Sequence, residues 1–244
     1  MLLHAPAAID ETSPVVVAVH GISRNSAEHF DAFRRALPAN AVLLCPEFGE
    51  AEFPHYQRLN IGYAEPRADL LLDLLLDRLS SRFRIDARRF HLFGFSGGGQ
   101  FAHRYAMLNP HRIQSLHVAA AGYYTFLNEA APWPYGCRGP TGRGILERQR
   151  LFLRLPIDVY VGNRDVQRDP SLRTGERIDA QQGPTRVDRA RNWVAHLNRC
   201  KPAGAPEARL TLLNGAGHDF MEAARCDKGV MMMAIGSEVA RATR

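Results

Sequence analysis

The sequence predicts an α/β fold in which a mostly parallel sheet is covered by helices on both faces. Several short runs, for example 15–19 and 157–161, are apolar at nearly every position, which is typical of strands buried on both faces. Segments of helical length stand between these runs, and this alternation favours parallel strands joined by crossover helices. The chain has 244 residues, 45% of them hydrophobic. That is enough for one such domain, which we expect to span 1–244.

Residues 1–83 are expected to supply two strong strands and two helices. Residues 1–14 leave room for one strand at most. A first apolar run is broken by His20-Gly21-Ile22-Ser23, and a second ends at Pro46. The loop at 49–65 is rich in aromatic residues. The expected elements are strands at 15–19 and 41–45 and helices at 26–37 and 66–83.

The helix at 66–83 carries an aspartate at every fourth position, namely Asp69, Asp73 and Asp77. Because side chains four residues apart lie on one face of a helix, we expect these three to form a solvated stripe. The leucines between them are then expected to be packed against the rest of the domain.

The rest of the chain continues the alternation but contains two irregular segments. Residues 123–156 are too long for an ordinary connection, and such loops usually act as lids or binding loops, so we expect a short cap with a basic helical piece at 146–153. Residues 164–184 are also expected to be irregular. Four further strands are expected: one that ends at Gly94, and three that span 113–121, 157–161 and 210–213. The expected helices span 97–108, 185–199 and 219–243, and the last of them is interrupted near Gly229 and Gly236.

Composition excludes several classes of function. The net charge is +6, but the arginines are scattered among acids rather than clustered, which argues against a nucleic-acid interface. No apolar run has the roughly 18–20 residues of a membrane span, and the first residues lack a secretion signal, so we expect a cytoplasmic protein. The four cysteines form no C-x-x-C pair, and we expect no metal and no cofactor. Cys45 is expected in the core, whereas pairing among Cys137, Cys200 and Cys226 stays open.

The most informative stretch is Gly94-Phe-Ser96-Gly-Gly98, which joins an apolar run to a helix-like segment. A serine on such a strand–turn–helix is held at a strained, accessible position, and small neighbours keep strand and helix apart. The helix after it directs its N–H groups toward the serine. The segment 97–102 also fits G-x-G-x-x-A, but it begins past the strand end, which argues against dinucleotide binding.

A serine nucleophile needs a base and an acid, and the strand ends supply candidates for both. His218 follows the last expected strand between small residues, and we predict it as the base that takes the Ser96 proton. Asp165 lies just after the preceding strand and is the expected acid, with Asp169 as the alternative. Asp219 is adjacent to the histidine and is badly placed to orient it.

Two backbone N–H groups are expected to bind the oxyanion of the reaction. One belongs to Gly97, directly after the serine, and the other to Ile22 in the turn after the first strand. His20 in that turn is expected to pack or form hydrogen bonds rather than act as a base.

In this nucleophile–acid–histidine order the sequence resembles the α/β-hydrolase superfamily, from about Val15 to the C-terminus. Within it, the chain is similar to small serine esterases of the polyhydroxybutyrate-depolymerase-like and feruloyl-esterase-like type. The resemblance implies the α/β-hydrolase fold, with His20-Gly21 as oxyanion turn and Ser96, Asp165 and His218 as triad. Two departures from the family are a shortened or missing N-terminal hairpin and a short cap at 123–156.

Substrate selection is expected in the two aromatic loops, although their aromatic side chains could equally pack a short cap. The candidate substrate-binding residues are Phe53, Tyr56, Tyr123, Trp133 and Tyr135. Nearby arginines either bind an acidic substrate or, as we prefer, form solvated surface; they are Arg138, Arg143, Arg164 and Arg168.

These features predict an enzyme that hydrolyses a carboxylic ester of a small molecule through an acyl-enzyme. A thioesterase or a peptidase would use the same triad, so the acyl class stays open. A function of a different class is a non-catalytic receptor on this fold, but such receptors usually lack a triad member and this chain has a candidate for each.

Overall fold

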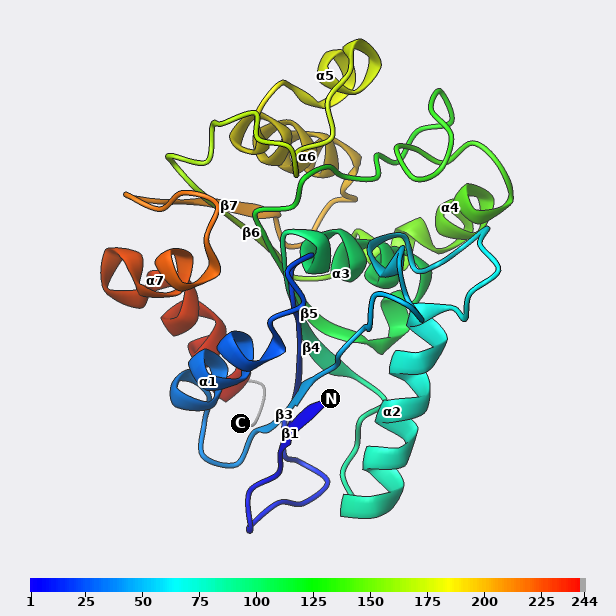
Figure 1. Cartoon of the computed structure of the whole chain (residues 1–244). Helices are drawn as coiled ribbons and strands as arrows, with labels where there is room; N and C mark the ends of the chain where they lie inside the picture. Colours follow the sequence, from blue (N-terminus) through cyan, green and yellow to red (C-terminus); the bar gives the residue numbers. More distant parts are fainter. Residues whose placement is uncertain (242–244) are drawn as a thin grey trace.

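The computed structural model describes residues 1–241 and contains one seven-stranded sheet (Figure 1). The strands are β1 (Leu2–His4), β2 (Val15–Val19), β3 (Val42–Cys45), β4 (Phe90–Phe95), β5 (Ile113–Ala119), β6 (Ile157–Gly162) and β7 (Arg209–Leu213). Their order in the sheet is β1-β3-β2-β4-β5-β6-β7. All neighbours are parallel except β1, which pairs antiparallel with β3. The predicted mostly parallel sheet is thus confirmed, and the N-terminal antiparallel part is a single short strand.

Helices cover both faces of the sheet, as predicted. They are α1 (Ser26–Ala36), η1 (Tyr56–Arg58), α2 (Ala68–Phe83), α3 (Gly97–Leu108), η2 (Pro110–Arg112), α4 (Pro140–Phe152), α5 (Glu176–Gln182), α6 (Arg186–Cys200) and α7 (Phe220–Arg241). In Figure 1, α1 and α7 lie on one side of the sheet and α2, α3 and α4 on the other. The winding changes direction between β2 and β4, and ligands of open α/β sheets bind at such a point.

The core explains why the strands are apolar at every position. All five residues of β2 are 1% exposed or less. Val16 and Ala18 pack in the cluster that includes residues of α1 and α7, whereas Val15, Val17 and Val19 pack with residues of α2 and α3. A strand covered on both faces has no polar side, because each face excludes water.

The expected solvated stripe on α2 is wrong for two of its three aspartates. Asp69 is 1% exposed and accepts hydrogen bonds from Arg67, and Asp73 accepts one from the Tyr105 hydroxyl of α3. Leu70 and Leu74 are exposed instead, by 56% and 47%. The spacing located one face of the helix, but Arg67, directly before the helix, and Tyr105 on α3 let the carboxylates lie at the packed side.

The other corrections concern segment boundaries. The cap helix α4 begins at Pro140, earlier than expected, and α5 lies within the stretch expected to be irregular. The long C-terminal helix is interrupted by non-helical residues from Cys226 to Gly229, as expected. Gly236 causes no interruption; a Cβ there would lie 2.4 Å from the carbonyl oxygen of Ala36, so this glycine lets α7 approach α1.

Two further expectations can be compared with the described residues. None of the helices within residues 1–241 is both long enough and apolar enough to cross a membrane. The cytoplasmic location remains a prediction. All four cysteines are free, with Cys45 and Cys137 buried, so the possible pairing among Cys137, Cys200 and Cys226 does not occur.

Candidate active site

Ser96 lies at the sharp turn between β4 and α3, with φ 54° and ψ −114°. A non-glycine residue at this backbone conformation is strained and persists only where its surroundings hold it. A Cβ on Gly94 would lie 2.1 Å from the carbonyl oxygen of Gly98, and one on Gly98 would lie 2.2 Å from that of Val19. The glycines on either side of Ser96 are therefore required by the close approach of β4, α3 and β2.

The three residues predicted as a triad lie together. Ser96 Oγ is 3.0 Å from His218 Nε2, and His218 Nδ1 is 2.7 Å from Asp165 Oδ2. Because the carboxylate accepts the Nδ1 proton, Nε2 is left as an acceptor for the serine proton. The ring of Phe95 stacks on the imidazole at 5.3 Å between centroids. The arrangement can deprotonate the serine and then stabilise the imidazolium that forms.

Arg186, at the start of α6, holds the acid and was missed by the sequence analysis. Its Nη1 donates to Asp165 Oδ1 at 3.1 Å and to Asp169 Oδ2 at 2.6 Å. The side chains of Arg186 and Asp165 are each 1% exposed. Asp169, the alternative acid, bonds Arg186 and Ser171 instead of the histidine, and the hydrogen bond from Arg186 lowers its pKa most. No local pattern marks Arg186, because its partners lie in a separate loop.

The turn after β2 lies beside the start of α3. A Cβ on Gly97 would be 3.4 Å from Ile22 N, so the two predicted oxyanion donors belong to adjoining backbone segments. The N–H of Ile22 has no hydrogen-bond partner within residues 1–241. His20 fixes this turn: Nδ1 bonds Gly21 O at 2.8 Å and Nε2 accepts the Phe48 N–H at 3.1 Å. Burial lowers the pKa of His20, which agrees with the expected structural role.

Comparison with solved structures identifies the fold. A poly(aspartic acid) hydrolase from Sphingomonas sp. KT-1 superposes with a TM-score of 0.79 at 22% identity, covering 91% of this chain and 89% of that chain. A poly(3-hydroxybutyrate) depolymerase from Bordetella parapertussis has a TM-score of 0.75 at 25% identity, covering 96% and 86%. A ferulic acid esterase has a TM-score of 0.59 at 15% identity, covering 95% and 86%. The chain has the α/β-hydrolase fold.

Sequence comparison adds nothing to this identification. No protein-family model matches the chain, and no curated protein is similar enough in sequence to be counted as a relative. The three structural neighbours given above are a hydrolase, a depolymerase and an esterase. The assignment to the α/β-hydrolase fold therefore rests on the similarity of the structures.

The first aromatic loop packs on the oxyanion turn. Tyr56 is completely buried, stacks on Phe48 at 5.3 Å and donates its hydroxyl to the carbonyl oxygen of His20 at 2.9 Å. It therefore supports the turn, which corrects its expected role as a substrate contact. Phe53 packs edge-on against Phe48 at 5.5 Å and is only partly buried.

The second aromatic loop forms a cluster over α3. Tyr123 and Tyr135 lie 5.1 Å apart between ring centroids. The guanidinium of Arg104 lies 4.6 Å from the Tyr123 ring centroid and 5.7 Å from that of Trp133. The Tyr123 hydroxyl accepts a hydrogen bond from Arg58 Nε at 3.0 Å, so the two aromatic loops are joined above the helix.

A cavity of about 850 Å³ lies between the cap loop and residues 173–181, which include most of α5. It is lined by Tyr135 and Arg138 among others, but by none of the triad residues. Of the other arginines expected at the mouth, Arg168 pairs with Asp179 at 2.7 Å, and Arg143 and Arg164 are exposed.

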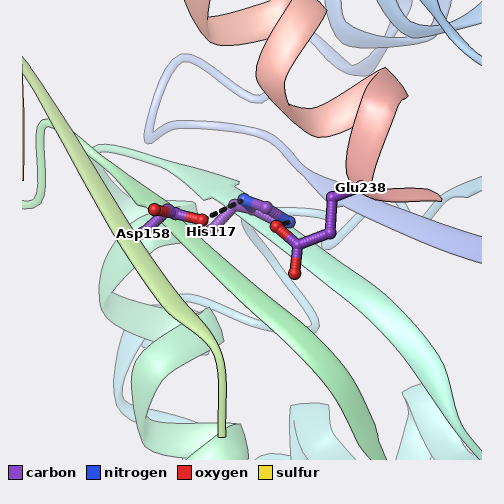
Figure 2. A group of neighbouring side chains, drawn as sticks. All are labelled: His117, Asp158 and Glu238. Carbon is purple, nitrogen blue, oxygen red and sulfur yellow. Dashed lines mark ion pairs between the residues drawn. The ribbon is translucent and has the colours of Figure 1, made fainter. Parts of the chain in front are cut away.

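A second group of serine, histidine and aspartate lies in the interior of the same sheet. Ser115 Oγ is 2.9 Å from His117 Nε2, and His117 Nδ1 is 3.9 Å from Asp158 Oδ2. Glu238 of α7 approaches His117 from the other side, also at 3.9 Å (Figure 2). The serine, the histidine and the aspartate all lie away from the carboxyl ends of their strands.

The donor set of His117, Asp158 and Glu238 could hold a metal ion by distance alone. However, Arg209 donates to both oxygens of Asp158, at 2.6 and 2.7 Å, and lies 3.8 Å from Glu238. Its guanidinium already supplies the positive charge that a metal would bring. We interpret this group as an ion-pair cluster that attaches α7 to the sheet.

Proposed function

We propose that the chain is a serine hydrolase that cleaves carboxylic esters of small molecules through an acyl-enzyme intermediate. The observation that carries the proposal is the continuous chain of contacts from Ser96 Oγ through His218 to Asp165. The names of the structural neighbours, which include a poly(3-hydroxybutyrate) depolymerase and a ferulic acid esterase, support the ester class.

In acylation, Ser96 Oγ attacks the ester carbonyl carbon and its proton passes to His218 Nε2. The carbonyl oxygen becomes an oxyanion, which the N–H groups of Ile22 and Gly97 stabilise. When the tetrahedral intermediate collapses, the bond to the alcohol oxygen breaks and His218 returns the proton to that oxygen. The alcohol leaves, and the acyl group stays on Ser96.

In deacylation, a water molecule loses a proton to His218 and attacks the acyl carbon. The same oxyanion donors act again, the bond to Ser96 Oγ breaks, and the serine recovers its proton from His218. Asp165 keeps the imidazole in one tautomer throughout, and Arg186 holds the carboxylate in place. His218 accepts the proton of Ser96 and later that of the attacking water, and it returns one to the leaving alcohol and one to Ser96.

Thioesters and amides are alternative substrates, because the steps differ only in the leaving atom. The hydrolase of poly(aspartic acid) among the structural neighbours keeps the peptidase class open. The non-catalytic receptor is the alternative of a different class, and the strained position of Ser96 argues against it, since a receptor gains nothing from that strain.

The decisive experiment is labelling with a fluorophosphonate probe, which reacts with an activated serine. The wild-type chain is expected to be labelled and Ser96→Ala is not. Ser115→Ala is the matched control, because Ser115 also lies beside a histidine but is 1% exposed, and it should be labelled like the wild type. A wild-type chain that stays unlabelled and hydrolyses no ester would favour the receptor.

A further inference from the structure

Arg58 stands out among the residues near the proposed active site because two of its guanidinium nitrogens bind tyrosines and the third binds nothing. Its Nε donates to the Tyr123 hydroxyl at 3.0 Å and its Nη1 to the Tyr63 hydroxyl at 2.8 Å. Its Nη2 bonds no described residue and is not enclosed by protein. Tyrosine hydroxyls fix the guanidinium in place without neutralising it.

The positive charge at this position is not compensated by any carboxylate within residues 1–241. Neither Arg58 nor Arg104, which lies behind the Tyr123 ring, takes part in an ion pair. Arg104 is completely buried and its Nη2 has no hydrogen-bond partner. The two comparably buried arginines, Arg186 and Arg189, both pair with aspartates. A cation removed from water without an anion is costly, so this pair of arginines marks a position suited to an anion.

Tyr123 reports the same local potential. Burial alone would raise its pKa, but the positive charges of Arg104 and Arg58 bring the pKa of the phenol below its ordinary value. A phenol with this environment is a good hydrogen-bond donor toward an incoming carboxylate.

The two elements that carry Arg58 and Arg104 also lead to Ser96. Arg58 ends η1, whose first residue, Tyr56, has its hydroxyl 2.7 Å from where a Cβ on Gly97 would lie. Arg104 is on α3, eight residues after Ser96, or about 12 Å along the helix axis. A carboxylate held by Arg58 and Tyr123 would thus be several bonds away from the carbonyl that Ser96 attacks.

Positive charge continues outward from this position. Tyr135 packs on Tyr123 and also lines the cavity of about 850 Å³. That cavity carries Arg138, Arg173 and Arg177 but only one acid, Glu176. The arginines along this surface would attract a negatively charged substrate made of more than one repeating unit.

We propose that Arg58, with Tyr123, binds a carboxylate of the substrate, so that the enzyme prefers esters bearing a negative charge some bonds away from the scissile carbonyl. This inference rests on the proposed serine hydrolysis and names its substrate class. Arg58 is then a residue that determines specificity, and Arg104 reinforces the local potential from behind the Tyr123 ring.

The test compares kcat/KM for matched esters with and without a carboxylate. On the acyl side, 4-nitrophenyl half-esters of adipate, pimelate and suberate are compared with 4-nitrophenyl alkanoates of equal length. On the alcohol side, 4-acetoxybenzoate is compared with phenyl acetate. The wild type is expected to favour the charged member of at least one set. Arg58→Gln should lower that preference by about 10- to 100-fold, the range for a hydrogen bond to a charged group, mainly through KM.

Two further variants keep the test decisive. Arg58→Lys should restore part of the preference, and Arg88→Gln, an exposed arginine paired with Asp86, should leave it unchanged. If Arg58→Gln fails to fold, Tyr123→Phe keeps the ring and should still weaken the preference. Equal hydrolysis of charged and neutral esters by wild type, or an unchanged ratio in Arg58→Gln, overturns the inference. Absence of both hydrolysis and probe labelling would instead overturn the proposed function.

Discussion

The sheet carries two groups made of the same three residue types, and only one of them has the features of an active site. In the first, Ser96, His218 and Asp165 come from three separate strand ends, with contacts of 3.0 and 2.7 Å. In the second, Ser115 and His117 lie on β5 and Asp158 on β6, with contacts of 2.9 and 3.9 Å. The serine–histidine distance alone does not distinguish them.

The difference lies in what surrounds each serine. Ser96 has a strained backbone, a helix N-terminus beside it and an N–H of Ile22 without a partner nearby. Ser115 lies within β5, and its hydroxyl lies between His91 and His117 at 2.7 and 2.9 Å. Backbone N–H groups inside a sheet are used by neighbouring strands, so none is available for an oxyanion. A strand end supplies free donors and access, and a strand interior supplies neither.

The largest expected contrast between the two groups comes from removing the charge of each aspartate. Asp165→Asn should lower kcat about 10⁴-fold, because the amide no longer fixes the imidazole in the tautomer that accepts the serine proton. Asp158→Asn removes the same charge from the interior group and should leave ester hydrolysis unchanged. Steady-state kinetics on both purified variants provide the comparison. A loss below about tenfold for Asp165→Asn would transfer the role of acid to Asp169.

A second contrast concerns the arginine bound to each carboxylate. Arg186 is 1% exposed and pairs with the buried Asp165, whereas Arg209 is 64% exposed. Arg186→Leu leaves a buried carboxylate without its cation, and we expect the free energy of unfolding to fall by about 3–5 kcal/mol. Hydrolysis should also slow, since the carboxylate loses the group that holds it. Urea unfolding measures the first effect and kcat the second.

The matched control for that substitution is Arg88→Leu. Arg88 pairs with Asp86 at 2.7 Å but its side chain is 88% exposed, so its loss should cost about 0–1 kcal/mol. An equal cost for both substitutions would show that Arg186 does not stabilise the buried acid.

The features that could be predicted from the sequence are those with a local signal. Apolar runs located the strands, and in a parallel sheet the carboxyl ends meet, so Ser96, Asp165 and His218 could be placed together from sequence. Arg186 could not, because its partners lie in a different loop and an arginine at the start of a helix has an ordinary surface pattern. The burial of Tyr56 likewise depends on a carbonyl at His20, a contact between distant segments.

The aspartates of α2 show that a local sequence pattern also does not determine whether a helix face is exposed. Their spacing of four correctly placed them on one face of the helix, yet the direction of that face depends on Arg67 and Tyr105, which pair with Asp69 and Asp73. The spacing reports which residues share a face, whereas the exposure of that face depends on the hydrogen-bond partners of its side chains, which the spacing does not contain.

A last contrast between the two groups concerns the dependence of stability on pH. Burial lowers the pKa of His117 from 6.5 to about 4, even though Asp158 acts in the opposite direction. Between these two values the unfolded chain binds a proton that the folded chain does not, so stability is fully present above pH 6.5 and is lost as the pH falls toward 4. This residue alone should contribute a slope of at most about 1.4 kcal/mol per pH unit.

His117→Gln should flatten the dependence of the free energy of unfolding on pH across that range. His91, whose pKa burial lowers to about 3, is present in both proteins, and the charge of His117 also lowers the pKa of His91, so the difference between the two slopes reports this coupled pair of histidines. Urea unfolding at several values between pH 7 and pH 4 measures both slopes, and parallel curves would mean that the interior group does not keep its histidine neutral.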